Sequence, residues 1–183
     1  MSAFALGAVV GVGIGGLVWQ AMKPRSLVVL DLNGLLVHRE YVRESMGKNP
    51  HFVLGNFNIW IRPGTDVFLD WLFESYDVGV WTSAQQHNAL GLVDIVFKDR
   101  APLFVWCQDM CDNLGERSFH KTISKIYDTY PLRNVLLIDD DASKTRLNPP
   151  DSCLNTEPWS RELVNDKGLE DLKTAIMEHF KQF

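Results

Sequence analysis

Beyond residue 25, the pattern of apolar and polar positions is dominated by short apolar runs that each end in a polar side chain. The runs are Leu27–Leu30, Val78–Trp81 and Asn134–Ile138, and they lead into Asp31, Thr82-Ser83 and Asp139-Asp140-Asp141. Apolar runs of this length, bounded by turn signals, predict strands that are buried on both faces of a sheet. The polar residues should therefore stand where these strands end.

Helical periodicity fills most of the segments between these strands. We expect one helix after an N-cap at Thr65, with its apolar face made by Val67, Phe68, Trp71 and Leu72. Further helices are expected at Gln85–Val96, His120–Tyr130 and Leu163–Phe183, the last with an interruption at Gly168.

The remaining segments complete the expected fold. Residues 39–59 predict a hairpin or flap over the strand ends, Pro102–Trp106 a short strand, and residues 145–160 irregular structure. Strands that alternate with helices indicate an α/β fold, a three-layer sandwich around a central, mostly parallel sheet.

The N-terminal segment has a different composition. Residues 2–22 have no charged side chain, and Lys23 and Arg25 follow at once. As a helix this stretch would reach about 31 Å, close to the thickness of a bilayer core. It is predicted to be an N-terminal hydrophobic helix that anchors the protein in a membrane, with a cleaved signal peptide or an arm folded onto the domain as alternatives. The two positive charges place the domain on the cytosolic side. The chain thus divides into an anchor at 1–25 and a domain at 26–183.

Charge and cysteine content narrow the possible ligands. The chain has 183 residues, a formal net charge of −5 and no basic stripe, which argues against direct binding of nucleic acid. The three cysteines are an odd count without framework spacing, as is usual in a reducing compartment. Cys107 and Cys111 with His120 could hold zinc. Because no fourth ligand stands at finger spacing, two partly buried thiols are the simpler interpretation.

The polar residues at the strand ends should converge at one edge of the sheet, because right-handed crossovers bring all the carboxyl ends together. Asp31, Asp139 and Asp140 supply carboxylates, Thr82 a hydroxyl and Lys121 an ammonium group. Crowded carboxylates repel one another unless a cation lies between them, and Mg²⁺ prefers such oxygen ligands. A metal beside a lysine and a hydroxyl can bind phosphate oxygens, and a carboxylate there can attack phosphorus. Taken singly, Thr82 could be a helix cap and Lys121 a surface lysine.

Several motifs in order resemble one family. They are LVVLDLNGLLVH at 27–38, Arg62-Pro63-Gly64, VGVWTSA at 78–84, His120-Lys121 and VLLIDDDASKTRLNPP at 135–150. They resemble the haloacid-dehalogenase superfamily and, within it, the NLI-interacting-factor-like family of small phosphatases acting on the RNA polymerase II C-terminal domain, notably a plant-type branch that reads DLNGLL. The resemblance implies a domain without a large cap. Its open site would suit phosphoserine or phosphothreonine on a protein partner.

The resemblance also assigns roles by position. Asp31 corresponds to the nucleophile. The metal would be held by Asp31, the backbone carbonyl of Asn33, Asp139 and Asp140. Phosphate oxygens would be bound by Thr82, Ser83, Lys121 and Arg62.

The first motif departs from the family pattern at Asn33, where the family has an aspartate that donates and accepts a proton. An amide cannot give up a proton at neutral pH, and loss of general acid–base catalysis typically costs about 10²–10⁴-fold in rate. The sequence therefore favours a Mg²⁺-dependent aspartate-nucleophile phosphatase of reduced activity. Two alternatives remain: an inactive pseudophosphatase that acts as a binding module, and a mitochondrial protein-import translocase subunit of the same fold, which would sit at a mitochondrial membrane.

Overall fold

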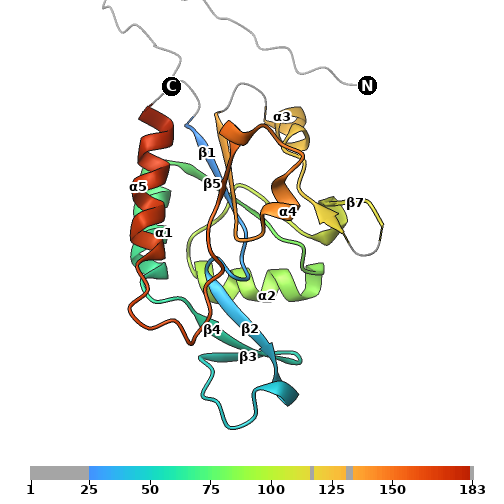
Figure 1. Cartoon of the computed structure of the whole chain (residues 1–183), viewed down its shortest axis with the longest axis vertical. Coiled ribbons are helices and arrows are strands. Elements are labelled where there is room, and N and C mark those ends of the chain that lie inside the picture. Colours follow the sequence, from blue (N-terminus) through green and yellow to red (C-terminus); the bar gives the residue numbers. More distant parts are fainter. Residues whose placement is uncertain (1–24, 116–117, 131–133, 182–183) are drawn as a thin grey trace, which may run out of the picture.

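Within residues 25–115, 118–130 and 134–181, which the computed structural model describes, the central element is a five-stranded parallel sheet (Figure 1). Its strand order is β10-β9-β1-β5-β6, and every neighbouring pair is parallel. The strands are β1 (Leu27–Leu30), β5 (Asp77–Trp81), β6 (Val105–Trp106), β9 (Val135–Asp139) and β10 (Cys153–Asn155). The α/β fold with a central parallel sheet is therefore confirmed.

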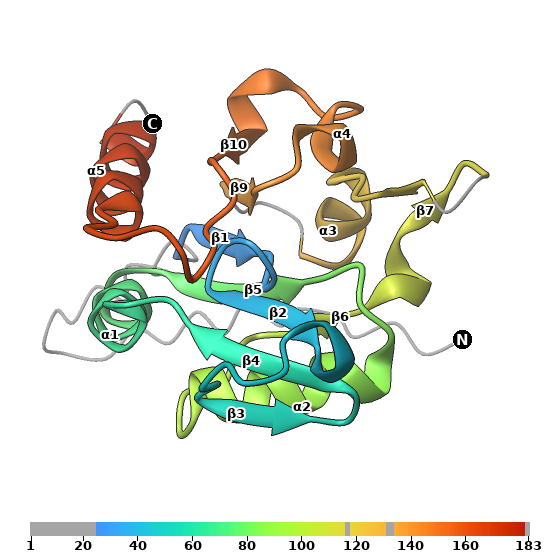
Figure 2. The ribbon, with the colours of Figure 1, turned by 60° about the horizontal axis from the view of Figure 1, so that its bottom comes forward.

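Helices cover both faces of this sheet, because its central strand is apolar on both sides. Val28 and Leu30 belong to a core cluster with the buried faces of α1 (Thr65–Ser75), α2 (Gln86–Phe97) and α5 (Gly168–Lys181). Leu27 and Val29 belong to a second cluster with α3 (Ser124–Thr129). Figure 2 shows α1 and α5 on one side of the sheet and α3 on the other. This arrangement is the expected three-layer sandwich.

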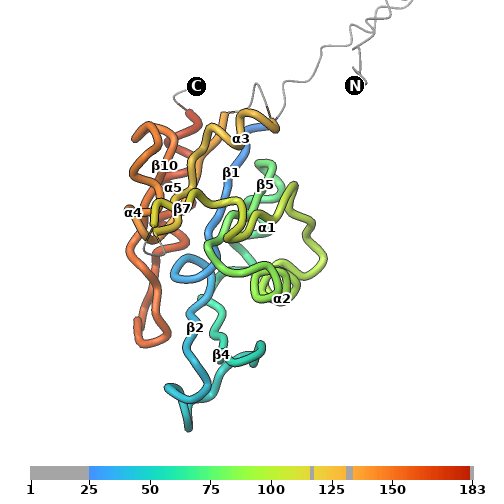
Figure 3. The backbone as a smooth tube through the Cα atoms, turned by 90° about the vertical axis from the view of Figure 1, so that its right-hand side faces the viewer, coloured from blue at the N-terminus to red at the C-terminus, as the bar shows by residue number. Residues whose placement is uncertain are grey.

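A smaller antiparallel sheet follows β1 in the sequence. It consists of β2 (Val37–Tyr41), β4 (Phe57–Ile61) and β3 (Phe52–Leu54), in that spatial order. Figures 1 and 3 place it beyond the carboxyl ends of the central strands. The hairpin or flap predicted for residues 39–59 is thus present as a three-stranded sheet.

The short elements complete the chain. A two-stranded sheet is formed by β7 (Asp112–Asn113) and β8 (Phe119–His120), and α4 (Ala142–Thr145) follows β9. Single 3₁₀ turns lie at Val42–Glu44, Gln108–Met110 and Pro150–Ser152. The segment predicted to be irregular, 145–160, therefore contains a turn and the edge strand β10. Its three residues are too few to show a period.

Three predicted helices begin elsewhere in the structure. The N-cap of α1 is Gly64, with φ +83°, and Thr65 is already helical. The last helix begins at Gly168 rather than Leu163, so the suspected interruption is its start. The helix predicted for His120–Tyr130 is only α3. His120 pairs with Asp112 in a strand instead, and this pairing removes the first residues from the helix.

The apolar face predicted for the first helix also needs correction. Val67 is 74% exposed, whereas Leu69 is buried between Phe68 and Leu72 on α1. With 3.6 residues per turn, an error of one residue in the assumed phase turns a side chain by about 100°, which is enough to move it from the core to solvent.

The predicted membrane anchor at residues 2–22 falls outside the described residues. Among the residues that the structure does describe, no helix combines the length and the apolar character needed to cross a bilayer.

Candidate active site

The centre of the site is a buried lysine between two aspartates. Lys121 Nζ donates to Asp31 Oδ1 at 2.7 Å and to Asp139 Oδ2 at 2.5 Å, and all three side chains are almost completely buried. Asp31 follows β1 and Asp139 ends β9, and these two strands are parallel neighbours in which Leu30 pairs with Ile138. The sheet register thus places the two carboxylates side by side, as the sequence predicted.

Lys121 reaches this position from a loop between β8 and α3. Its backbone N–H donates to the carbonyl of Lys144 at 2.9 Å, and Asn148 Nδ2 donates to its carbonyl at 2.7 Å. Asn148 Oδ1 also accepts the N–H of Ile123 at 2.7 Å, at the start of the next helix. The segment after β9 therefore holds the lysine in place. The sequence interpretation assigned no part to Asn148, since a loop asparagine has no distinguishing pattern.

Asp140 completes a group of three carboxylates. Asp31, Asp139 and Asp140 each offer an oxygen within 4.8 Å of the others. Asp140 Oδ1 is buried and has no hydrogen-bond partner among the described residues. A buried oxygen without a partner is costly, and a bound cation would satisfy it. The donor set of three carboxylates, all hard oxygen ligands, fits Mg²⁺.

Gly34 makes the close approach of Asp140 possible. A Cβ atom at this position would lie 2.0 Å from Asp140 Oδ2, and the φ of +85° is one that other residues rarely adopt. The turn that begins at Asn33 thus brings the backbone against the carboxylate. The Asn33 side chain itself is exposed to solvent. The loop is further fixed by Trp159, whose N–H donates to the Gly34 carbonyl at 2.7 Å.

Burial and charge shift the protonation equilibria in the cluster. Burial raises the pKa of Asp140 to about 7, and the carboxylates of Asp31 and Asp139 add to this effect. Burial, with repulsion from Asp31, also raises the pKa of Asp139. For Lys121, burial works against the charged form, but Asp31 and Asp139 outweigh it and raise its pKa. The lysine is therefore held as a cation between the two carboxylates.

Lys144 is a second cation that the sequence interpretation missed. Its Nζ lies 3.7 Å from Asp139 Oδ1 and 4.0 Å from Asp141 Oδ2. Despite burial, the charges of Asp31 and Asp139 raise its pKa. Its place in the DDDASK segment, directly after the acidic strand end, was the available signal.

Thr82 and Ser83 occupy the end of β5, the neighbour of β1 on the other side. The register pairs Leu30 with Val80, so Thr82 lies one residue beyond the level of Asp31. Thr82 is buried, and its Oγ1 accepts the N–H of Ala84 at 3.2 Å. Ser83 is half-buried and lines a pocket with Arg39 and Gln108. The topology brings Thr82 to the same sheet edge as the carboxylates.

Arg62, which was expected to bind phosphate, lies elsewhere. Its guanidinium makes a bidentate ion pair with Asp166, with N–O distances of 2.5 and 2.8 Å, and donates to the Leu35 carbonyl at 2.9 Å. Both side chains of the pair are about 95% buried. Three donors already engaged inside the protein leave this arginine a structural role, which corrects the expectation. It ties the loop after β1 to the start of α5.

The cysteines adjoin the site without forming a metal centre in the described part of the chain. Cys107 and Cys111 are buried, and burial raises the pKa of both thiols. Cys111 Sγ donates to the Thr82 carbonyl at 3.9 Å, and His120 Nε2 pairs with Ser118 Oγ at 2.8 Å. The Cys111 thiol thus contacts the residue that follows β5.

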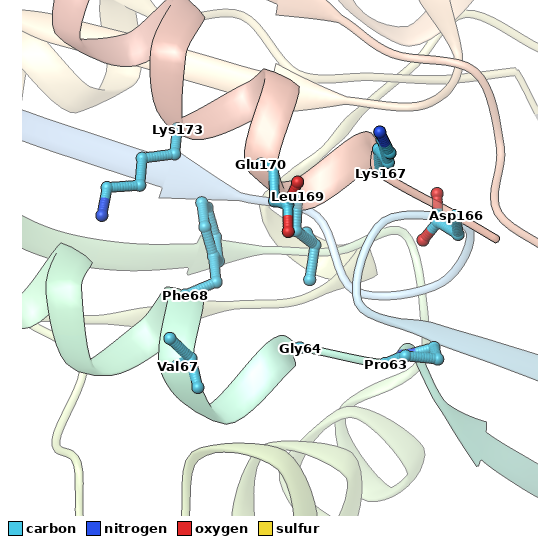
Figure 4. Close-up of a pocket in the computed structure, with 9 residues that line it drawn as sticks. All are labelled: Pro63, Gly64, Val67, Phe68, Asp166, Lys167, Leu169, Glu170 and Lys173. Carbon is cyan, nitrogen blue, oxygen red and sulfur yellow. The ribbon is translucent and has the colours of Figure 1, made fainter.

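A separate cavity of about 390 Å³ lies between α1 and α5 (Figure 4). Phe68 and Leu169 form its apolar wall, and Asp166, Lys167 and Glu170 stand around it. None of the predicted site residues lines this cavity. It adjoins the Arg62–Asp166 pair and lies away from the carboxylates.

The chain is similar to several known proteins. The chain matches the TIM50 subunit of the mitochondrial import inner membrane translocase from Caenorhabditis briggsae, with 26% identity over 156 residues. This match covers 85% of the chain and 31% of the relative, so the chain spans about a third of that protein. A CTD phosphatase-like protein of Invertebrate iridescent virus 3 is 26% identical over 141 residues, covering 68% of the chain and 75% of the relative.

A solved structure shows the same fold at lower identity. The structure of Fcp1, an RNA polymerase II CTD phosphatase, superimposes with a TM-score of 0.56 at 19% identity, covering 87% of this chain and 50% of Fcp1. The model of the NLI interacting factor-like phosphatases matches residues 26–183, the whole predicted domain. The chain therefore belongs to the NLI interacting factor-like phosphatase family.

Proposed function

We propose that this protein is a Mg²⁺-dependent phosphatase that uses Asp31 as its nucleophile and acts on phosphoserine or phosphothreonine in a protein. The observation that supports this most strongly is the pairing of Asp31 with the buried Lys121, beside two further carboxylates and an oxygen without a partner. Lys121 keeps Asp31 in place through its hydrogen bond to Oδ1. The similarity to a CTD phosphatase-like protein supports a phosphoprotein as the substrate.

The chain's own residues then have distinct tasks. Asp31 attacks phosphorus, a new bond forms between the carboxylate oxygen and phosphorus, and the bond to the serine or threonine oxygen breaks. Lys121 orients Asp31 through Oδ1. Asp139 and Asp140, with Asp31, would hold Mg²⁺, which supplies charge neutralisation for the phosphoryl oxygens. The Thr82 hydroxyl, at the same sheet edge, would bind one of these oxygens.

Asn33 limits turnover at two points. The leaving alkoxide needs a proton, which Asn33 cannot supply, so that proton must come from water. The water that hydrolyses the aspartyl-phosphate also lacks a base at this position. We therefore expect aryl phosphates, whose leaving groups need little protonation, to be turned over faster than phosphoserine peptides.

The decisive experiment compares three proteins on an aryl phosphate with Mg²⁺. Asp31→Asn should abolish turnover. Asn33→Asp should raise it by about 10²–10⁴-fold, with a larger gain on a phosphoserine peptide than on the aryl phosphate. Wild-type turnover that does not depend on Asp31 would contradict the enzyme hypothesis. If Asn33→Asp gains nothing, the missing acid does not limit the rate.

A second candidate is a binding module without turnover, and two observations favour it. Asn33 replaces a proton carrier, and the relatives include TIM50 subunits of a mitochondrial import translocase. In that case the domain would bind a protein partner at a mitochondrial membrane, with residues 2–22 as its anchor. A localisation tag at the C-terminus would show with which membrane the protein associates. In a binding module, Asp31→Asn would leave the capture of the protein partner unchanged.

A further inference from the structure

A polar pocket of about 370 Å³ lies beside the carboxylate cluster, between the small sheet and the start of α2. Arg39 of β2 lines it on one side, and Ser83, Gln85, Asn88 and Gln108 line the other. The aromatic side chains Tyr41, Phe57 and Phe119 also line it. Of the described residues that line the pocket, Arg39 has the single formal charge. The pocket is therefore positively charged, although it adjoins a negative cluster.

Arg39 differs from the other buried or half-buried arginines in its partners. Arg62 pairs with Asp166, Arg100 with Asp70, and Arg161 with Glu40. No carboxylate of the described residues lies within ion-pairing distance of the Arg39 guanidinium. Burial lowers the pKa of Arg39, whereas Tyr41 and Asp31 counteract this shift.

The ring of Phe57 holds the guanidinium in the pocket. The Cζ atom of Arg39 lies 4.4 Å from the ring centre, a cation–π contact that positions the charge without neutralising it. Opposite Arg39, α2 begins after Gln85 with no acidic residue in its first turn. The N-terminus of a helix favours negative charge, so both walls attract an anion.

We propose that this pocket is an anion subsite in which Arg39 binds an acidic side chain, phosphorylated or carboxylic, that neighbours the phosphorylated residue presented to Asp31. The inference rests on the proposed function. Asp31 and Thr82 do not line the pocket, and its volume accommodates a side chain and not just one phosphoryl group. Arg39 is then a specificity-determining residue that selects doubly acidic segments of a substrate.

Peptide binding tests this directly, in proteins that all have Asp31→Asn so that nothing is turned over. The probes are a fluorescent peptide with one phosphoserine among neutral residues, and versions with a second phosphoserine or a glutamate a few residues before or after it. A second anion should tighten binding about tenfold, the value of one charge-assisted hydrogen bond. Arg39→Gln should abolish this gain, and Arg39→Lys should keep part of it.

The matched control is Arg43→Gln, which removes the same charge from an exposed side chain four residues further along. It should keep the gain. Equal weakening of all the peptides by Arg39→Gln would mean that Arg39 contacts the reacting phosphoryl group, and would overturn the subsite. So would the lack of any gain with Arg39 present. Binding of no peptide at all would contradict the phosphoprotein substrate itself, which separates that failure from failure of the subsite.

Discussion

Two buried ion clusters lie on either side of the loop after β1, and they differ in charge balance. Arg62 and Asp166 form a closed pair of one cation and one anion, joined by two hydrogen bonds. Around Lys121, three carboxylates meet one buried ammonium and the partly exposed Lys144, and an oxygen of Asp140 has no partner among the described residues. A balanced buried pair holds elements together. An unbalanced cluster at a strand end is suited to a ligand of opposite charge.

A glycine also packs closely against each cluster. A Cβ at Gly34 would lie 2.0 Å from Asp140, and a Cβ at Gly168 would lie 1.9 Å from the Arg62 guanidinium. The two clusters can therefore be disturbed by equivalent substitutions. Matched substitutions of the two glycines can therefore test whether one cluster is structural and the other binds a ligand.

The largest effect is expected from Lys121→Met without metal. Removing the ammonium leaves Asp31 and Asp139 buried and unpaired, which should cost about 3–5 kcal/mol of unfolding free energy in urea. Mg²⁺ should restore part of this loss. The control Lys98→Met, which breaks an exposed pair with Asp66, should cost about 0–1 kcal/mol. Equal costs for the two variants would mean that the cluster is not buried and charged as described.

The closed pair should behave differently when it is broken. Arg62→Met strands the Asp166 carboxylate and should cost about 3 kcal/mol, without a response to Mg²⁺. Adding Asp166→Asn to this variant should recover part of the loss. If Arg62→Met leaves stability unchanged and weakens the binding of inorganic phosphate, Arg62 is a phosphate ligand. The two clusters would then not differ in role.

The two glycines give an intermediate effect. Gly34→Ala forces alanine into a positive φ and against Asp140, so it should cost about 1–3 kcal/mol and also weaken Mg²⁺ binding in calorimetry. Gly168→Ala should destabilise the fold by displacing Arg62 while Mg²⁺ affinity stays the same. If both variants lose Mg²⁺ affinity alike, the two clusters are coupled and not separate.

The last prediction concerns how stability changes with pH. The pKa of Asp140 is raised to about 7 from an ordinary 3.8, so the folded state binds the proton more tightly than the unfolded state. Without metal, this group makes stability fall as pH rises from about 4 to about 7. Asp140→Asn should remove that fall and raise the thermal midpoint at pH 8, with little change at pH 4. If stability depends on pH in the same way in Asp140→Asn, another group of the cluster binds this proton.

Much of the fold was predictable from the sequence because it depends on local patterns. The runs at Leu27–Leu30 and Val78–Trp81 are apolar at every position, and burial on both faces is the way a parallel sheet accommodates such runs. Parallel strands with right-handed crossovers then bring Asp31, Thr82 and Asp139 to one edge. The sequence alone thus determined the sheet and the acidic strand ends. By the same reasoning, a three-residue strand such as β10 could not be found.

Only the tertiary structure decided which charge serves which purpose. Arg62 and Asp166 are 104 residues apart, and no local pattern predicts that they meet. Arg39 carries no signal in the sequence, and only the fold places it in a pocket with no carboxylate partner among the described residues. Lys121 was expected on a helix and is held instead by the segment after β9. Periodicity reports which residues are buried, whereas ion pairing depends on which buried groups come within a few ångströms, and long-range packing alone sets that.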